Sequence, residues 1–310
     1  MNIIHIIAPL VLVGLAGFIA TKSQWLTRTQ LDALSKFTFH LAIPAFLFLQ
    51  MAQADIKSHL DLAIYGAFYI PVIIVFFIAY VSNYYFHSNY RKEDDASAAY
   101  ALAASYSNNI IVGLPVILLA LGEHYLAIVF MIVVFHSAML FTLTSALAAR
   151  KQKTSVMSTL KSTLLNPLII AIIAGALTNI LLTQTGNKLP TILVDSLTLL
   201  GKPAISLALF ALGGSMTYYQ VKSEKYFIGF ACLLKLAILP SFVFLTATYG
   251  FALAQDVTLV LVIMSACPTG VNAYLIAKNY ENHQETVAGT VVVTTVLSVL
   301  TIPVWLMLLS

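Results

Sequence analysis

Charged residues are scarce in this sequence: Asp, Glu, Lys and Arg make up 9% of 310 residues, whereas 60% are hydrophobic. Soluble domains carry about 25% charged residues, so this composition excludes a soluble globular protein. The apolar runs are long and uninterrupted, which excludes a membrane β-barrel, because its strands alternate about every second residue. We therefore expect an all-α integral membrane protein with several spans.

Signals for other classes of protein are also lacking. The only two cysteines, Cys232 and Cys267, fall in apolar segments, so we expect neither a disulfide nor a metal pair. Neither a His-Glu-x-x-His nor a Gly-x-Ser-x-Gly motif occurs, so we expect no enzyme and no bound cofactor. The net charge of +4 comes from Lys and Arg scattered between apolar segments. That pattern is typical of membrane topology and argues against a nucleic-acid partner.

The apolar runs predict ten transmembrane segments, since a hydrocarbon core requires about 20 apolar residues per helix. The predicted segments are 3–20, 31–52, 62–86, 96–122, 124–149, 161–183, 189–217, 226–250, 256–280 and 284–309. The connections between them are short, and no soluble domain is expected. No cleavable signal peptide is evident, so we expect the first segment to be a retained helix contacting membrane lipid like the others.

Lysines and arginines in the loops predict the orientation of the chain. Loops after segments 1, 3, 5, 7 and 9 hold eleven of them, whereas the loops on the other side hold only Lys57 and Lys188. The eleven are Lys22, Arg28, Arg91, Lys92, Arg150, Lys151, Lys153, Lys161, Lys222, Lys225 and Lys278. The positive-inside rule places these in the cytoplasm, so both termini are expected on the extracytoplasmic side.

The two halves of the chain repeat at a nearly constant offset. Pro44 and Pro203 are 159 residues apart, and Glu123-His and Asn282-His share that separation. Five helices per half is an odd number, so the second half must be inserted upside down. This predicts an inverted-topology repeat made of residues 1–149 and 161–310, joined by a basic cytoplasmic loop at 150–160.

Segments 4 and 9 carry matching interruptions. Segment 4 contains Ser105-Tyr-Ser-Asn-Asn-Ile-Ile-Val-Gly-Leu-Pro115, and segment 9 contains Ser265-Ala-Cys-Pro-Thr-Gly-Val-Asn272. Gly and Pro weaken a helix, and amide side chains need partners that lipid does not offer. Two broken helices in corresponding places indicate the substrate site of a secondary transporter, and the exposed N–H groups of half-helix starts suit an anion.

These interruptions supply most of the predicted substrate-binding residues. The full set is Ser105, Asn108, Asn109, Gly113, Pro115, His136, Lys202, Ser265, Pro268, Thr269, Gly270 and Asn272. The amides can hydrogen-bond a carboxylate and the hydroxyls can assist, although each can instead satisfy only freed backbone. The two glycines serve backbone geometry and close approach. His136 either contacts substrate or packs between helices, and Lys202 and Lys235 are candidates because ionisable residues inside membrane segments are usually functional.

The chain resembles the auxin efflux carrier family, which includes plant auxin exporters and bacterial organic-acid carriers. Three stretches carry the resemblance: Leu-Ala-Ile-Pro44-Ala-Phe-Leu-Phe, Asn108-Asn-Ile-Ile-Val-Gly-Leu-Pro115 and Cys267-Pro-Thr-Gly-Val-Asn272. The short basic central loop is similar to that of bacterial members. The resemblance implies a ten-helix fold of two inverted repeats whose broken helices 4 and 9 cross.

It also implies a scaffold of helices 1, 2, 6 and 7, a homodimer through helices 2 and 7, and a transport domain of helices 3–5 and 8–10. A small carboxylate would be carried across a bacterial inner membrane by an elevator-like motion. Two alternatives stay open: a sodium-coupled symporter of a larger amphipathic anion such as a bile acid, and a ligand-binding sensor without flux. The coupling ion, H+ or Na+, is not decided by the sequence, although the lack of clustered intramembrane carboxylates argues against a sodium site.

Overall fold

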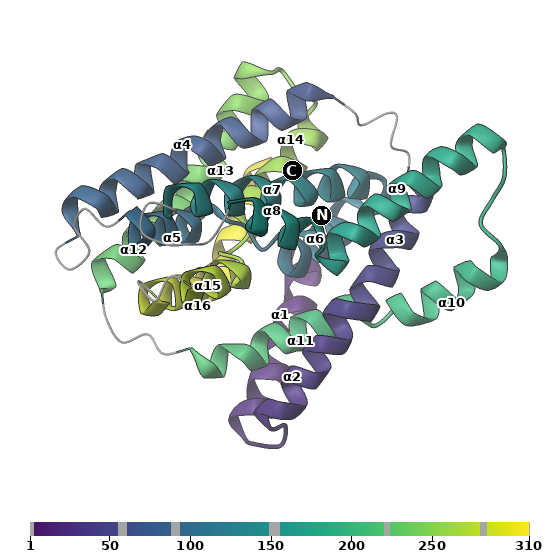
Figure 1. Cartoon of the computed structure of the whole chain (residues 1–310), viewed down its shortest axis with the longest axis horizontal. Helices are drawn as coiled ribbons and strands as arrows, with labels where there is room; N and C mark the ends of the chain where they lie inside the picture. Colours follow the sequence, from purple (N-terminus) through teal and green to yellow (C-terminus); the bar gives the residue numbers. More distant parts are fainter. Residues whose placement is uncertain are drawn as a thin grey trace.

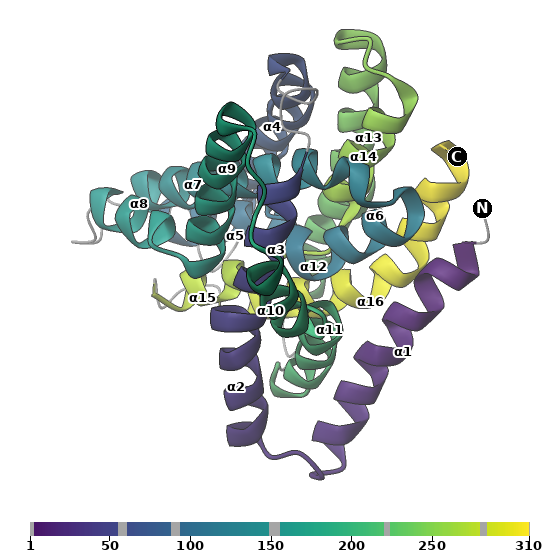
Figure 2. The ribbon, with the colours of Figure 1, turned by 90° about the vertical axis from the view of Figure 1, so that its right-hand side faces the viewer.

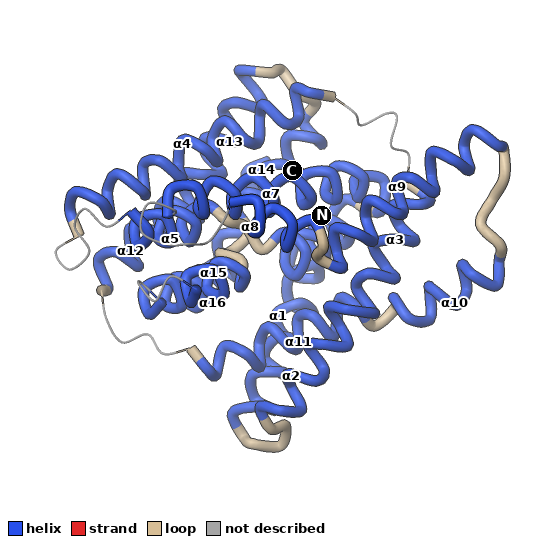
Figure 3. The backbone as a smooth tube through the Cα atoms, viewed as in Figure 1, coloured by secondary structure: helices blue, strands red, loops and turns tan. Residues whose placement is uncertain are grey.

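A computed structural model describes residues 3–54, 61–87, 94–148, 156–219, 224–279 and 284–309, and within these ranges it is helical with no strand (Figure 3). Eight of the described helical stretches are long and apolar enough to cross a membrane. The expectation of an all-α membrane protein is confirmed at this level. The inverted relation between the two halves stays a prediction.

The long helical stretches coincide with eight of the ten predicted segments. In the first half they are α1 (Ile3–Lys22), α2 (Arg28–Phe37) with η1 (Thr38–Ala42) and α3 (Ile43–Gln53), α4 (Leu62–Phe86), and η4 (Glu123–Tyr125) with α7 (Leu126–Ala148). In the second half they are α9 (Pro167–Thr185), α10 (Thr191–Gly201) with α11 (Ala204–Ser215) and η5 (Met216–Tyr218), α12 (Lys225–Leu233) with η6 (Leu234–Ile238), α13 (Leu239–Leu245) and η7 (Thr246–Gly250), and α16 (Gln284–Leu309).

The remaining two predicted segments are present in pieces. The first comprises α5 (Asp94–Ser105), η3 (Asn109–Gly113) and α6 (Leu114–Leu121). The second comprises α14 (Gln255–Ala266) and α15 (Val271–Asn279). Both breaks fall within the stretches whose Gly, Pro and Asn residues indicated an interruption.

One of these eight segments begins later in the structure than predicted. Residues 161–183 are not a single helix, because α8 (Val156–Leu164) ends before Asn166 and α9 begins at Pro167. Asn166 accepts a hydrogen bond from the backbone N–H of Leu168 at 2.9 Å and so caps α9. Proline without an N–H suits the first position of a helix, which explains why the chain restarts there. Part of the loop expected at 150–160 therefore belongs to α8.

Several residues used for the orientation lie outside the described ranges, so their positions carry no further argument. They are Lys57, Arg91, Lys92, Arg150, Lys151, Lys153 and Lys222.

Three π-helical segments each lead into a helix with proline near its start. These are η1 before Pro44, η3 before Pro115 and η6 before Pro240. Proline offers no N–H for the usual bond to the residue four positions earlier. In the wider turn before the proline, an N–H bonds to the carbonyl five positions earlier, as where Ile43 donates to Thr38.

Glycine contacts hold α1 directly against α11. A Cβ added to Gly213 would lie 1.9 Å from the carbonyl oxygen of Gly14, and one added to Gly17 would lie 2.0 Å from that of Phe210. Such close backbone approach is typical of small residues at membrane helix interfaces. Helix α3 packs against α9 and α10. Helices α3, α9 and α10 lie together on the right-hand side of Figure 1.

A second group of helices packs around the two broken segments. Helix α5 lies against α4 and α7, and α14 lies against α13 and α16. Helices α5 and α14 are buried along almost their whole length, so the breaks lie in the protein interior. Helices α1 and α16 are in contact, and the start of α1 lies close to the end of α16 (Figure 2).

Candidate functional site

The two interruptions lie against each other although they are far apart in the sequence. Ser107 and Thr269 form an isolated antiparallel β-bridge. The backbone N–H of Asn108 donates to the carbonyl of Pro268 at 2.8 Å, and that of Gly270 donates to the carbonyl of Tyr106 at 3.0 Å. Each break therefore supplies hydrogen-bond partners that the other lost when its helix ended.

Side chains of neighbouring helices satisfy two more of the freed backbone groups. The backbone N–H of Thr269 donates to the hydroxyl of Thr294 in α16 at 3.0 Å. The backbone N–H of Ser107 donates to His136 Nε2 in α7 at 2.9 Å. Because Nε2 accepts a hydrogen bond, the neutral imidazole carries its proton on Nδ1. His136 thus packs between helices and stabilises the first break, and its Nδ1–H faces the cavity wall without a partner.

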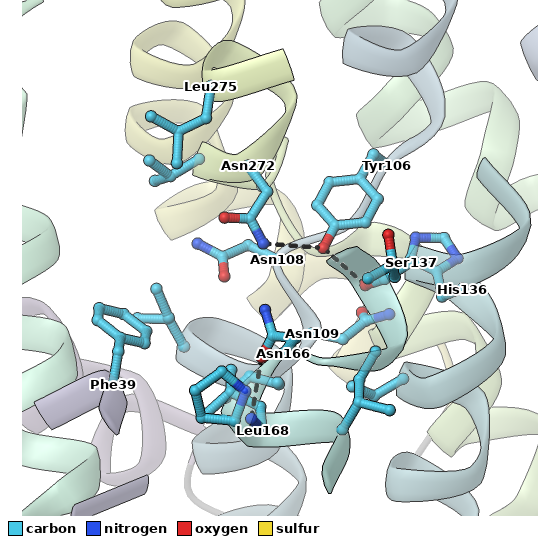
Figure 4. A pocket seen from close by; sticks show the side chains of 18 of the residues that line it. Phe39, Tyr106, Asn108, Asn109, His136, Ser137, Asn166, Leu168, Asn272 and Leu275 are labelled. Carbon is cyan, nitrogen blue, oxygen red and sulfur yellow. Dashed lines mark hydrogen bonds between the residues drawn. The ribbon is translucent and has the colours of Figure 1, made fainter. Parts of the chain in front are cut away.

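A cavity of about 630 Å³ lies beside the paired breaks (Figure 4). Residues of α2, η1, η3, α7, α8, α9, α11 and α15 line it. The lining includes the starts of η3 and α15, where helical N–H groups lack partners within the helix. Five predicted site residues line the cavity: Asn108, Asn109, His136, Gly270 and Asn272.

Four of the lining side chains carry polar atoms that are buried and have no hydrogen-bond partner. They are Ser107 Oγ, Asn108 Nδ2, both Nδ2 and Oδ1 of Asn109, and His136 Nδ1. Buried polar groups in proteins are nearly always hydrogen-bonded, so this cluster makes the cavity wall the candidate ligand site. Most of these atoms are donors, and donors favour an anion.

Tyr106 also lines the cavity, next to these groups. Its hydroxyl lies 3.0 Å from Ser137 Oγ and accepts a hydrogen bond from Asn272 Nδ2 at 3.4 Å (Figure 4). Its ring stacks on His136 with centroids 5.1 Å apart and planes 14° apart. A Cβ added to Gly270 would lie 2.4 Å from the same ring. Tyr106 therefore links the first break to α7 and α15 and fixes how closely they approach.

Other predicted site residues hold the breaks together without lining the cavity. The hydroxyl of Thr269 donates to the carbonyl of Ala103 at 2.7 Å, and the carbonyl of Pro268 is used by Asn108. Gly113 lies against Cys267, because an added Cβ would be 3.0 Å from its sulfur. Pro115 is buried near the start of α6.

Three predicted site residues take positions away from the cavity. The hydroxyl of Ser105 donates to the carbonyl of Ala101, and that of Ser265 donates to the carbonyl of Val262, both at 2.8 Å. Both hydroxyls are therefore used within their own helices. Lys202 is exposed at the end of α10 and is not part of the cavity wall.

The sequence interpretation missed several residues of the cavity. Tyr106 lies inside the quoted stretch and Ser137 follows His136, but neither was singled out. Asp32, His40 and Asn166 also line the cavity, from elements far away in the sequence. Asn166 directly before Pro167 is a helix-start signal that could have drawn attention to this position.

The two helix breaks are buried, contact each other and lie beside a cavity whose wall carries unpartnered donors. In an apolar helical chain, these features are typical of a membrane transport protein. The chain belongs to the family described as "Membrane transport protein", whose sequence model matches residues 2–306. The match confirms the resemblance to the auxin efflux carrier family.

Two bacterial relatives are named as transporters. The chain is 27% identical over 279 residues to the "Putative malonate transporter" of Rhizobium meliloti (strain 1021), covering 87% of this chain and 84% of that protein. It is 22% identical over 313 residues to the "Uncharacterized transporter YfdV" of Escherichia coli (strain K12), covering 96% and 95%. These names describe transport and no enzymatic reaction.

Proposed function

We propose that this chain is a secondary transporter of small organic anions, with mono- and dicarboxylates as its substrate class. The observation that carries the proposal is the cluster of buried, unpartnered polar atoms on Asn108, Asn109 and His136 beside the cavity. A carboxylate has two oxygens that accept several hydrogen bonds, so it matches this set of donors. The printed name of the Rhizobium meliloti relative, which refers to malonate, supports the same class.

In this proposal the carboxylate lies in the cavity beside the paired breaks. Asn108 and Asn109 approach it from the first break and Asn272 from the second, while His136 donates through Nδ1. The N-terminal ends of η3 and α15 add partial positive charge, since aligned peptide dipoles favour anions at helix starts. Tyr106 sets the distance between the first break and α15, which carries Asn272.

Transport would follow an elevator-type motion. The α1, α2–α3, α9 and α10–α11 helices form the proposed scaffold, and the helices packed around α5 and α14 form the proposed moving unit. The apolar side chains of Ile192 and Leu199 on α10 are 81% and 75% exposed. This suits a homodimer through predicted segments 2 and 7, which are α2–α3 and α10–α11 in the structure. A bacterial inner-membrane location with both termini outside the cytoplasm belongs to the same proposal.

Uptake by proteoliposomes tests the function. Purified protein is reconstituted, and entry of radiolabelled malonate, acetate and succinate is measured under imposed H+, Na+ or substrate gradients. We expect saturable uptake of at least one acid, competed by unlabelled acid and lost in Asn109→Ala and Asn272→Ala. Binding without flux under every gradient would instead identify a sensor, and strict dependence on Na+ with preference for a bile acid would identify the symporter alternative.

A further inference from the structure

Lys235 lies in the π-helical segment η6 and is completely buried, with 0% of its surface exposed. Its Nζ donates to the carbonyl oxygen of Ser265 at 2.5 Å. No carboxylate among the described residues forms an ion pair with it. Burial of an unpaired charge is costly, so the position calls for a specific partner.

That partner is the broken end of α14. In a continuous helix the carbonyls of Met264, Ser265 and Ala266 would accept the N–H groups of residues 268, 269 and 270. Residue 268 is Pro, which has no N–H. The N–H of Thr269 donates to Thr294 instead, and that of Gly270 donates to Tyr106.

Three adjacent carbonyls thus lose their helical donors at the negative end of a helix dipole, and Lys235 binds the central one. Half-helix ends and unwound carbonyls of this kind are where secondary transporters coordinate a coupling cation. The first break differs, because the freed carbonyl of Ala103 accepts the neutral hydroxyl of Thr269. The cation is therefore specific to the second break.

We propose that the Lys235 ammonium is the resident cation of the transport site. It occupies the carbonyl-lined end of α14 where a sodium-coupled carrier would bind its ion, so this chain binds and moves its anion without Na+. The inference rests on the proposed function, and it refines that function by excluding Na+ as the coupling ion. Lys235 acts as a positioning residue, because it holds the break through Ser265 and does not line the cavity.

Thermal stability of the detergent-solubilised protein in NaCl and in equimolar choline chloride tests the inference. Wild type should unfold at the same temperature in both salts. In choline chloride, Lys235→Ala should unfold at a temperature about 2–4 °C or more below that of wild type. In NaCl it should regain part of that loss, because Na+ can enter the space vacated among the carbonyls. Lys235→Met should show the same loss without the sodium effect, because its side chain fills that space.

Lys225→Ala, which removes an exposed lysine from the start of α12, is the control and should match wild type in both salts. Saturable stabilisation of wild type by Na+ would overturn the inference, and this measurement decides the matter even if Lys235→Ala does not fold. Equal response of Lys235→Ala and Lys235→Met to Na+ would also overturn it. These readouts do not require flux, so failure of the proteoliposome assay would refute the proposed function separately.

Discussion

The hydroxyl of Thr269 donates a hydrogen bond to the carbonyl oxygen of Ala103 across 166 residues of sequence, at 2.7 Å. The carbonyl of Ala103 has no helical donor of its own, because the N–H of Ser107 is turned toward His136. The same Thr269 pairs with Ser107 in the β-bridge. One side chain of the second break thus completes the helix end of the first break and joins the two breaks.

Replacing Thr269 by Val tests this coupling, because Val keeps the shape and removes the donor. The carbonyl of Ala103 is then buried without a partner, so the free energy of unfolding should fall by about 1–3 kcal/mol. Thr269→Ser should retain most of the stability. Thr185→Val serves as the control, because that hydroxyl is exposed and bonds only within α9. Thermal unfolding measures all three variants, and equal stability of Thr269→Val and wild type would contradict the coupling.

Asn109→Ala should separate binding from stability. Neither polar atom of the Asn109 side chain has a partner, so its removal should leave the unfolding temperature unchanged or slightly raised. Loss of one hydrogen bond to a charged ligand, about 1.5–3 kcal/mol, should raise the Kd for malonate roughly 10- to 150-fold. Isothermal titration calorimetry or ligand-induced thermal shift measures the change.

The matched control for that variant is Asn179→Ala. The Asn179 side chain in α9 donates to the carbonyls of Ala52 and Ala54 at 2.9 and 2.8 Å, so it has a structural role at the end of α3. Its removal should lower stability and leave the Kd of the correctly folded protein unchanged. Similar effects of the two asparagine variants on both quantities would refute the assignment of Asn109 to ligand.

His136→Phe should affect both stability and binding. Phenylalanine preserves the aromatic contact with Tyr106 but leaves the buried N–H of Ser107 without an acceptor, which costs about 1–3 kcal/mol of unfolding free energy. Loss of Nδ1 also removes a donor from the cavity wall, so stabilisation by malonate should disappear. His5→Phe, at an exposed position of α1, is the control and should behave as wild type in both assays. Retained malonate stabilisation in His136→Phe would exclude His136 from the site.

The sequence predicted where helices run and break better than it predicted which side chains face the cavity. The apolar runs and the Gly, Pro and Asn residues within them act locally, so they locate α5, η3 and α14 without knowledge of neighbours. For Ser105 and Ser265 the sequence left two uses open, because a helical serine can donate either to its own backbone or across a site, and both donate to their own backbone. Sequence alone does not distinguish these two uses.

Tyr106 and Ser137 were missed for a related physical reason. An aromatic ring or a hydroxyl in an apolar segment has the same sequence signature whether it packs in the core or lines a cavity. Only the approach of Gly270 to the Tyr106 ring, and the contact of its hydroxyl with Ser137 and Asn272, reveal the role. Lys202 was included as an ionisable residue inside a long segment, but the turn at Pro203 leaves it exposed at the end of α10.

Gly270→Ala tests whether the closeness of the two breaks is required for binding. The added methyl group would lie 2.4 and 2.6 Å from two atoms of the Tyr106 ring, so the ring must move. Its displacement breaks the contacts with Ser137 and Asn272 and the stacking on His136. We expect weaker malonate binding and lower uptake even in protein that remains folded, because the wall that positions the donors has shifted.

Gly229→Ala in α12 is the matched control, since nothing lies within 4 Å of the added methyl group. In a helix interior, Ala should stabilise the protein by about 0.5–1 kcal/mol relative to Gly and leave uptake unchanged. A Gly270→Ala variant that binds malonate and transports it like the Gly229→Ala variant would show that the cavity tolerates displacement of Tyr106. In that case the donors of Asn108, Asn109 and His136 would be sufficient for binding without Tyr106, which would then only support the fold.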